Sequence, residues 1–269
     1  MTANEWVTEH TPQDRPNSAR IYDYLLGGYH NFEIDRLAAE KYIAAMPDFR
    51  LGAQANRAFL RRAVHFCLEQ GIDQFLDLGS GIPTAGNVHE IAQQTNPAAR
   101  VVYVDIDPVA VAHSLAILRD NPNAAAIQAD VAQPEQVLEH AEVKRLLDFR
   151  RPAAILFAAV LHFVMDDHQA YRTVRVFRDA LTCGGYVAIT HFTFDDAPPD
   201  TIERYEKVMA QPSVSKARTH AETAQFFDGL ELVSPGLVHF PLWRPEGPDD
   251  VLLGQPGRVL GWGGVGRRP

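Results

Sequence analysis

The sequence predicts an α/β fold built on a doubly wound, mostly parallel sheet of seven strands. Short apolar runs alternate with segments of helical periodicity, an order typical of parallel strands joined by helices. The clearest of these runs, RVVYV, is continuously β-branched or aromatic, as expected of a strand buried on both faces. The last two strand-like runs have no helix between them, which predicts an antiparallel C-terminal hairpin.

Three helices precede the first strand, and we interpret the N-terminal part of the chain as a tail and helical cap. Asn17 is a typical N-cap residue for the first helix, and Gly27-Gly28 ends it. The helices are predicted over residues 17–26, 33–46 and 53–69. The predicted cap covers residues 1–54, and the main domain covers residues 55–269.

Five β-α repeats then follow in order. Their strands are predicted over residues 74–78, 100–104, 125–129, 153–158 and 186–190. The helices after the first four strands are predicted over residues 86–94, 108–120, 135–147 and 167–181. Pro108 opens the second of these helices in its first turn, where the missing N–H costs nothing.

The end of the chain departs from this repeat. Residues 192–218, with a predicted helix over 200–210, are inserted after the fifth strand, and we expect them to form a lid. Thr219 and Glu222 form a capping box for the next helix. The strand-like runs 231–240 and 258–262 then provide the hairpin.

Composition restricts the class of protein. The chain has 269 residues, of which 46% are hydrophobic, enough to bury a sizeable core. Its formal net charge of −9 argues against a broad nucleic-acid surface and against binding to anionic membranes. No signal-peptide pattern and no run long enough to span a bilayer is present, so we expect a cytoplasmic protein. Cys67 and Cys183 are expected to be reduced, buried thiols, and the sequence shows no metal-ligand spacing.

The stretch DQFLDLGSGIPT runs from the first strand into a glycine turn. Gly79 and Gly81 lack Cβ atoms, so ligand atoms can approach the backbone there, including that of Ser80. Dinucleotide sites place another glycine three residues later and hold a pyrophosphate at the following helix start. Here Thr84 stands at that position, and Pro83 removes an N–H donor. The turn therefore predicts a ligand that is not held by phosphates.

Acidic residues follow at the next two strand ends. Asp105 comes 26 residues after Gly79 and suits the two hydroxyls of a ribose, whose hydrogens its oxygens can accept. Asp130 can accept a hydrogen bond from the exocyclic amine of adenine, and the backbone N–H of Val131 can donate to a ring nitrogen. Because the carboxyl ends of parallel strands meet at one edge, these residues predict an adenosine site.

This constellation resembles the class I S-adenosylmethionine-dependent methyltransferases. The resemblance covers roughly residues 55–269 and implies a Rossmann-like fold, S-adenosyl-L-methionine as cofactor, and a glycine turn that faces the methionine part. The segments SARIYDYLLGGYHNFEIDR, ANRAFLRRAV and QFLDLGSGIPT are more narrowly similar to a bacterial S-adenosyl methyltransferase family long described as of unknown function. In the broader family a third glycine often stands where this sequence has Pro83. The resemblance implies no substrate.

Further cofactor contacts are predicted by position. Arg57 is a candidate for the cofactor's carboxylate, with Arg20 as a second candidate, and an exposed surface charge is the alternative for both. Tyr24 belongs to an aromatic group that either covers the sulfonium or packs as a helical cap. The other members of that group are Tyr22, Tyr29 and Phe32. Ile106 and Ala158 complete the predicted cofactor-binding set.

His162 and His191 follow or end the fourth and fifth strands, on the predicted floor of an acceptor pocket. A general base is needed only for a nucleophile that is protonated at pH 7, and a packing role is the alternative for each histidine. The sequence thus predicts a methyltransferase acting on a small-molecule acceptor. One alternative is a cofactor-binding sensor or inactive homologue. The other is an NAD-dependent Rossmann oxidoreductase, which Thr84 and the terminal hairpin disfavour.

Overall fold

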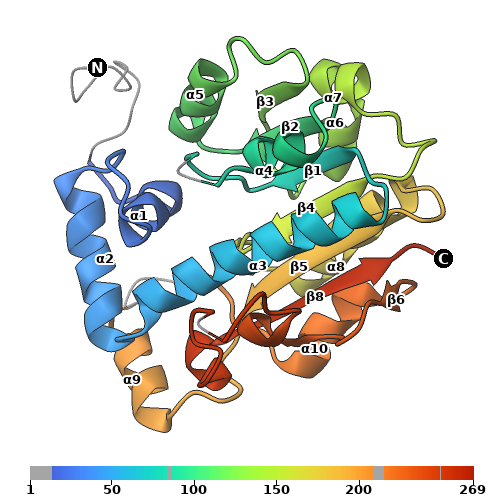
Figure 1. The fold of residues 1–269 in the computed structure, drawn as a ribbon. Coiled ribbons are helices and arrows are strands. Elements are labelled where there is room, and N and C mark those ends of the chain that lie inside the picture. The colour runs from blue at the N-terminus through green and yellow to red at the C-terminus, as the bar shows by residue number, and fades with distance from the viewer. Residues whose placement is uncertain (1–13, 84–85, 209–214, 249) are drawn as a thin grey trace.

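The sheet of the computed structural model has eight strands. Seven of them form the linear order, as predicted, and the eighth arises because the strand predicted over 231–240 is divided in two. The model describes residues 14–83, 86–208, 215–248 and 250–269. Its strands are β1 (Gln74–Leu78), β2 (Arg100–Asp105), β3 (Ala124–Gln128), β4 (Ala154–Ala158), β5 (Tyr186–Phe192), β6 (Glu231–Leu232), β7 (Val238–His239) and β8 (Gly261–Arg267). Their order is β3-β2-β1-β4-β5-β8-β6 (Figure 1). Both β6 and β7 pair with β8, β6 near its end and β7 near its start. The first five strands are parallel, and β8 is antiparallel to β5, β6 and β7, which confirms the predicted topology.

Helices cover both faces of this sheet. They are α1 (Ser18–Leu25), α2 (Glu33–Ala45), α3 (Phe49–Glu69), α4 (Val88–Thr95), α5 (Pro108–Ile117), α6 (Pro134–Glu139), α7 (Ala141–Leu146), α8 (Asp167–Ala180), α9 (Pro199–Val208) and α10 (His220–Ala224). Phe75 of β1 belongs to the buried cluster that includes α3 and α4. The next residue, Leu76, belongs to the cluster that includes α7 and α8. Successive strand residues thus face opposite layers, as in a doubly wound fold.

The N-terminal helices form a separate small cluster on this core. The Asn17 side chain accepts hydrogen bonds from the N–H groups of Ala19 and Arg20, so the predicted N-cap is confirmed. Arg20 is fully buried, and its Nε donates to Asp35 at 2.7 Å, which joins α1 to α2. Helix α3 is continuous from Phe49 and runs across the boundary predicted between residues 54 and 55. Figure 1 shows α2 leading down to α9, the helix of the predicted lid.

Two elements are interrupted where the sequence predicts a continuous one. The helix predicted over 135–147 is broken into α6 and α7 at His140, whose extended backbone allows its Nδ1 to accept from the N–H of Glu142. The strand predicted over 231–240 is interrupted around Pro235, because proline has no N–H for the ladder.

The last strand lies later than predicted, over Gly261–Arg267 instead of 258–262. Its glycines let aromatic rings pack against the strand backbone. A Cβ at Gly261 would lie 2.3 Å from the ring of Phe240. Glycine is depleted in strands, so propensity alone does not predict this one.

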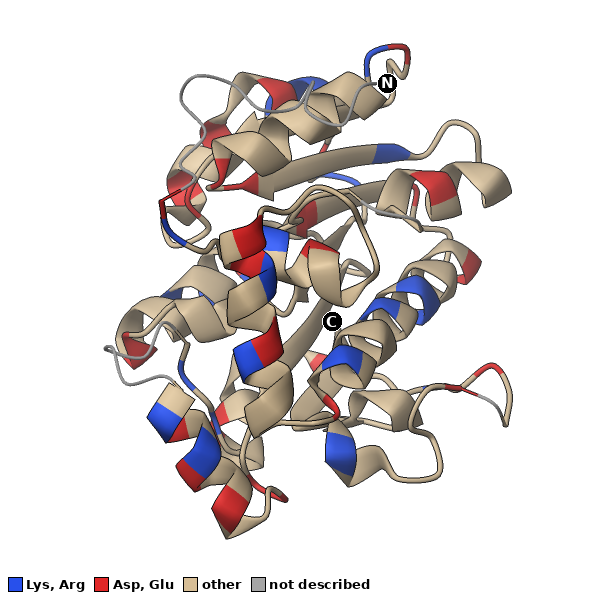
Figure 2. Ribbon diagram, turned by 90° about the vertical axis from the view of Figure 1, so that its left-hand side faces the viewer, with Lys and Arg blue, Asp and Glu red and all other residues tan. Residues whose placement is uncertain are grey.

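The two cysteines differ in their exposure to solvent. Cys67 is buried but Cys183 is exposed, so the prediction of two buried thiols is wrong for Cys183. None of the helices in the described residues combines the length and apolar character needed to cross a bilayer. In Figure 2 basic and acidic residues are interspersed along the same helices.

Candidate functional site

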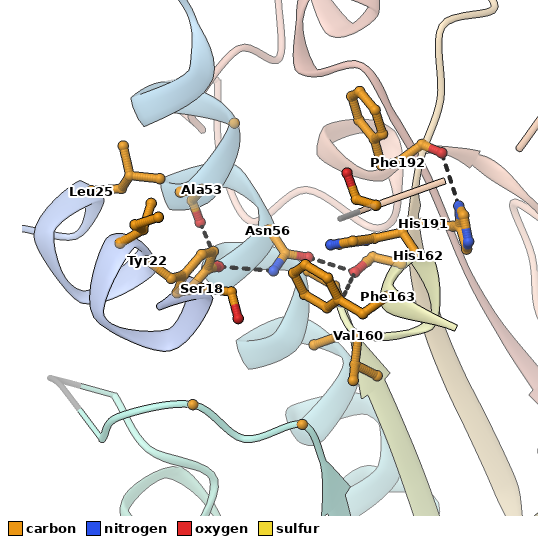
Figure 3. A pocket seen from close by; sticks show the side chains of 18 of the residues that line it. Ser18, Tyr22, Leu25, Ala53, Asn56, Val160, His162, Phe163, His191 and Phe192 are labelled. Carbon is orange, nitrogen blue, oxygen red and sulfur yellow. Dashed lines mark hydrogen bonds between the residues drawn. The ribbon is translucent and has the colours of Figure 1, made fainter. Parts of the chain in front are cut away.

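A cavity of about 1560 Å³ lies beyond the carboxyl ends of the parallel strands. The strand order reverses between β1 and β4, and ligands of open α/β sheets bind at such a point. Helices α1, α2, α3 and α9 contribute the other walls. Figure 3 shows Tyr22 and Leu25 of α1 on one side, His162, His191 and Phe192 on the other, and Asn56 of α3 between them.

The glycine turn after β1 forms one wall of the cavity. Gly79 has φ +68°, and a Cβ there would lie 2.2 Å from Cγ2 of Val160, so no other residue fits without displacing the next strand's loop. The N–H groups of Gly79 and Ser80 both donate to the carbonyl of Val104, at 2.8 and 3.1 Å. Gly81, in contrast, faces open space. Thr84 lies outside the described residues.

Asp105 stands where β2 ends, beside this turn. Its Oδ2 accepts the N–H of Gly81 at 2.7 Å, and its Oδ1 accepts the N–H of Asp107 at 2.8 Å. Burial raises the pKa of this carboxyl, although the two backbone hydrogen bonds act in the opposite direction. A carboxylate offers about four lone-pair positions. Backbone N–H groups of Gly81, Asp107 and Ile106 use part of this capacity, and Asp105 lines the cavity.

The other predicted residues of strands β2 to β4 lie on the same wall. Ile106, Asp130, Val131 and Ala158 all line the cavity. Ile106 is 64% exposed, which is unusual for a large apolar side chain beside polar groups. Oδ1 of Asp130 accepts the N–H of Ala132 at 2.8 Å, so its carboxylate is held by its own loop.

Asp77 is a cavity residue that the sequence analysis missed. It lies inside β1 and is 3% exposed, and burial raises its pKa to about 7. The nearby Arg57 guanidinium lowers the pKa of Asp77, and Asp105 raises it further. A signal was present in the sequence, because an acid in a strand buried on both faces is rarely there for packing alone.

Arg57 extends from α3 into the cavity. Its Nε is buried and has no hydrogen-bond partner in the described part of the chain, which marks a place for an acceptor atom. Its guanidinium carbon lies 5.9 Å from the ring centre of Tyr22. The arginine therefore presents an unsatisfied positive group to the same space as Asp77.

A hydrogen-bonded chain crosses the cavity from α1 to β4 (Figure 3). The Tyr22 hydroxyl donates to the carbonyl of Ala53 at 3.1 Å and accepts from Nδ2 of Asn56 at 2.8 Å. Thr190 donates to Oδ1 of Asn56 at 2.6 Å and accepts the N–H of Ala159 at 2.9 Å. Ala159 has φ +58°, a strained conformation for a residue with a Cβ, and it directly follows β4.

The other N-terminal aromatic residues lie elsewhere. Tyr24 is not among the residues that line the cavity, and its hydroxyl donates to Glu40 at 2.6 Å. Tyr29 is 90% exposed. The Arg20 guanidinium lies 5.2 Å from the ring centre of Phe32, on the far side of the cap. Only Tyr22 of the four predicted aromatic residues reaches the cavity.

His162 and His191 lie together, with ring centres 5.9 Å apart. Nδ1 of His162 is buried without a hydrogen-bond partner in the described residues, and burial lowers its pKa to about 3. Both nitrogens of His191 are engaged: Nδ1 contacts the carbonyl of Phe192 at 2.8 Å and Nε2 contacts Nη1 of Arg218 at 2.9 Å. Because a carbonyl only accepts and a guanidinium only donates, His191 is neutral with its proton on Nδ1.

Arg218, which the sequence analysis did not single out, fixes this corner of the site. It is fully buried, and its guanidinium donates to Asp167 and to the carbonyls of Leu161 and Val164. These carbonyls flank His162 in the 3-10 turn Leu161–Phe163. The end of the predicted lid therefore holds the turn that carries His162.

Comparisons with known proteins agree with this geometry. A profile of the family described as S-adenosyl methyltransferase matches residues 4–269. The chain belongs to this family. A candidate methyltransferase from Thermobifida fusca is 43% identical, with a TM-score of 0.90 over 98% of this chain and 99% of that one. A DUF574 family protein from Streptomyces avermitilis is 38% identical, with a TM-score of 0.88 over 95% of this chain and 98% of that one. No curated protein matches the sequence.

Proposed function

We propose that this member of the S-adenosyl methyltransferase family transfers a methyl group from S-adenosyl-L-methionine to a small molecule. One observation supports this most: the glycine turn and the acids of three adjacent strands, Asp77, Asp105 and Asp130, line one wall of a single cavity. His162 lies on the wall opposite α1 (Figure 3). The interspersed charges in Figure 2 give no reason to expect a nucleic-acid substrate.

The side chains of this wall fit each part of the cofactor. Asp105, which lines the cavity, suits the ribose hydroxyls, and Asp130 with the N–H of Val131 suits adenine. Arg57, whose Nε lacks a partner in the described residues, suits a carboxylate, and Asp77 suits an ammonium group. In place of the predicted Tyr24 we assign the aromatic contact to Tyr22, which lines the cavity. Where a dinucleotide site has an N–H donor and a third glycine, this sequence has Pro83 and Thr84, which disfavours an NAD-dependent oxidoreductase.

Bound S-adenosylmethionine supplies a methyl group on a positively charged sulfur. The chain then has to orient the acceptor and exclude water, and positioning of this kind accounts for roughly 7–11 kcal/mol of a barrier. His162 is neutral at physiological pH, so it can accept a hydrogen bond from the acceptor's nucleophile. We assign this role to His162 rather than His191, because both nitrogens of His191 are occupied.

Substitution of Asp105 tests the assignment. Asp105→Ala removes one or two charge-assisted hydrogen bonds to the cofactor, so we expect roughly 10- to 100-fold weaker binding of S-adenosylhomocysteine by titration calorimetry. Asp166→Ala is the matched control, since Asp166 lines the same cavity but caps α8. Equal affinities of wild type and Asp105→Ala would remove Asp105 from the site.

Transfer itself needs a separate test, because a sensor or inactive homologue would bind the cofactor equally well. Protein incubated with methyl-labelled S-adenosylmethionine and a cell extract should release labelled products of low molecular mass. Binding without any labelled product would favour the sensor. Thermal stabilisation by NAD but not by S-adenosylhomocysteine would favour the oxidoreductase.

A further inference from the structure

We propose that the acceptor is a flat aromatic molecule with a hydroxyl group and no negative charge, bound between the lid and the turn that carries His162. This inference rests on the proposed function and specifies its substrate class. It concerns the half of the cavity beyond β4 and β5, which the cofactor residues of β1 to β3 leave free. The volume of about 1560 Å³ exceeds the range of about 300–1,000 Å³ typical of a site for one small ligand, so it has room for two.

Aromatic rings from distant parts of the chain form the walls of this half. Phe192 at the end of β5 lies 5.5 Å from Tyr205 of α9, measured between ring centres. Tyr42 of α2 lies 5.5 Å from Phe49 of α3, and Phe163 adds a ring beside His162. All of these line the cavity. Flat surfaces of this kind favour a planar aromatic ligand through offset or edge-to-face contacts.

Two of the carboxylates in this half have side-chain partners within the protein, and a third, Asp166, has none among the described residues. Asp48 accepts from Nε of Arg258 at 2.7 Å and also from its Nη2. Asp196 contacts Nε2 of His239 at 2.6 Å. Asp166 is the exposed N-cap of α8, and its charge disfavours an anionic ligand. An anionic acceptor would therefore lose its hydration without gaining an unpaired positive charge here.

The free cations of the lining belong to the other half. Arg57 lies beside Asp77. Arg15 lines the cavity just before α1, and this helix lies next to the glycine turn, because its Ala19 packs against Ile82 and α5. An acceptor carboxylate or phosphate would have to reach past the cofactor to meet them. The two halves of the cavity therefore differ in charge, because the lining arginines without a carboxylate hydrogen-bonded to them in the described residues lie in the half formed by β1 to β3.

One polar atom in this apolar half indicates where a polar group of the ligand would bind. Nδ1 of His162 is buried and has no hydrogen-bond partner in the described part of the chain. A ligand that supplies a hydroxyl there would satisfy it. In the proposed reaction the oxygen of this hydroxyl bonds to the methyl carbon as the carbon–sulfur bond of the sulfonium breaks, and the hydroxyl proton passes by way of His162 to solvent. A plain aromatic hydrocarbon would leave the nitrogen unpaired.

Matched ligands test the proposal on the full chain loaded with S-adenosylhomocysteine. We expect 2-naphthol to bind at least about tenfold more tightly than 2-naphthoate at pH 7.5, because the carboxylate finds no partner. Naphthalene should bind more weakly than 2-naphthol, and His162→Phe should abolish that difference. Titration calorimetry or saturation-transfer NMR measures all three ligands.

Tyr205→Leu should weaken 2-naphthol binding without changing the affinity for S-adenosylhomocysteine. The control is Tyr171→Leu, since Tyr171 also uses its hydroxyl, toward the carbonyl of Glu222, but does not line the cavity. Equal or tighter binding of 2-naphthoate, or no binding of either ligand to the loaded protein, would overturn the proposal. Failure of the protein to bind S-adenosylhomocysteine would instead overturn the proposed function.

Discussion

Asp77 occupies a position where burial and charge act against each other. Its carboxyl group is almost inaccessible to solvent, and the cost of ionising it there exceeds the attraction of Arg57, so its pKa rises to about 7. Near neutral pH the side chain is therefore divided between its two protonation states. A cationic ligand beside it would favour the ionised state.

This predicts a pH-dependent affinity for the cofactor. Below pH 7 the carboxyl must lose its proton when the ammonium group of S-adenosylhomocysteine binds beside it, so affinity should increase from pH 5 to pH 7, by at most about tenfold per pH unit, and level off above. Calorimetry in buffers of different ionisation enthalpy counts the released proton. Asp77→Asn should remove both effects, and an unchanged pH profile in this variant would exclude Asp77 as their source.

At the scale of elements, the end of the lid and the turn Leu161–Phe163 act as one unit. The N–H of Lys216 donates to the carbonyl of His162 at 2.7 Å, and Arg218 binds the carbonyls on either side of that residue. Arg218 also sets the tautomer of His191. A movement of the lid would therefore move His162 as well.

The tautomer gives a direct prediction for His191. Burial lowers its pKa to about 4, and the nearby Arg218 cation lowers it further, so the ring should stay neutral at pH 6 with its proton on Nδ1. Long-range ¹H–¹⁵N correlation spectra distinguish this form from the other tautomer and from imidazolium. The exposed His168 serves as the internal control, as a histidine in contact with solvent. A doubly protonated His191 at pH 6 would contradict the arrangement.

The elements also show what sequence patterns can and cannot predict. β1 begins and ends where predicted, because a short apolar run followed by glycine is a strong signal. The break at His140 and the glycine-rich β8 were not predicted, because both depend on partners distant in sequence or on a side-chain cap.

The candidate site shows the same limit. Asp105 and Asp130 were found because strand ends share an edge of the sheet. Tyr22 was not distinguished from Tyr24, because the choice depends on how α1 packs against Ala53 and Asn56 of α3. Arg218 was missed because its partners lie about 50 residues before it, in the turn after β4.

For the molecule as a whole, the strand order separates the two proposed ligand sites. β1, β2 and β3 lie on one side of the reversal and carry the acids, whereas β4 and β5 lie on the other side and carry the histidines. The N-terminal helices and the lid enclose both halves. The same enclosure buries ionisable groups, so the stability of the protein should depend on pH.

Three histidines with lowered pKa values should make the protein sensitive to acid. Burial lowers the pKa of His162 to about 3 and the pKa values of His113 and His191 to about 4. Between pH 6 and pH 5 the unfolded chain binds protons at these residues and the folded chain does not, so stability is lost as the pH falls. Buried carboxyls with raised pKa values, such as Asp77, act in the opposite direction.

We therefore expect the free energy of unfolding to fall by roughly 1–3 kcal/mol per pH unit in this range, measured by urea denaturation. His113→Gln should reduce the slope by about 1.4 kcal/mol per pH unit, the contribution of one proton. His168→Gln is the matched control, because His168 is exposed and should leave the slope unchanged. A slope in His113→Gln equal to that of the wild type would show that His113 binds its proton as readily in the folded protein as in the unfolded chain, contrary to the prediction.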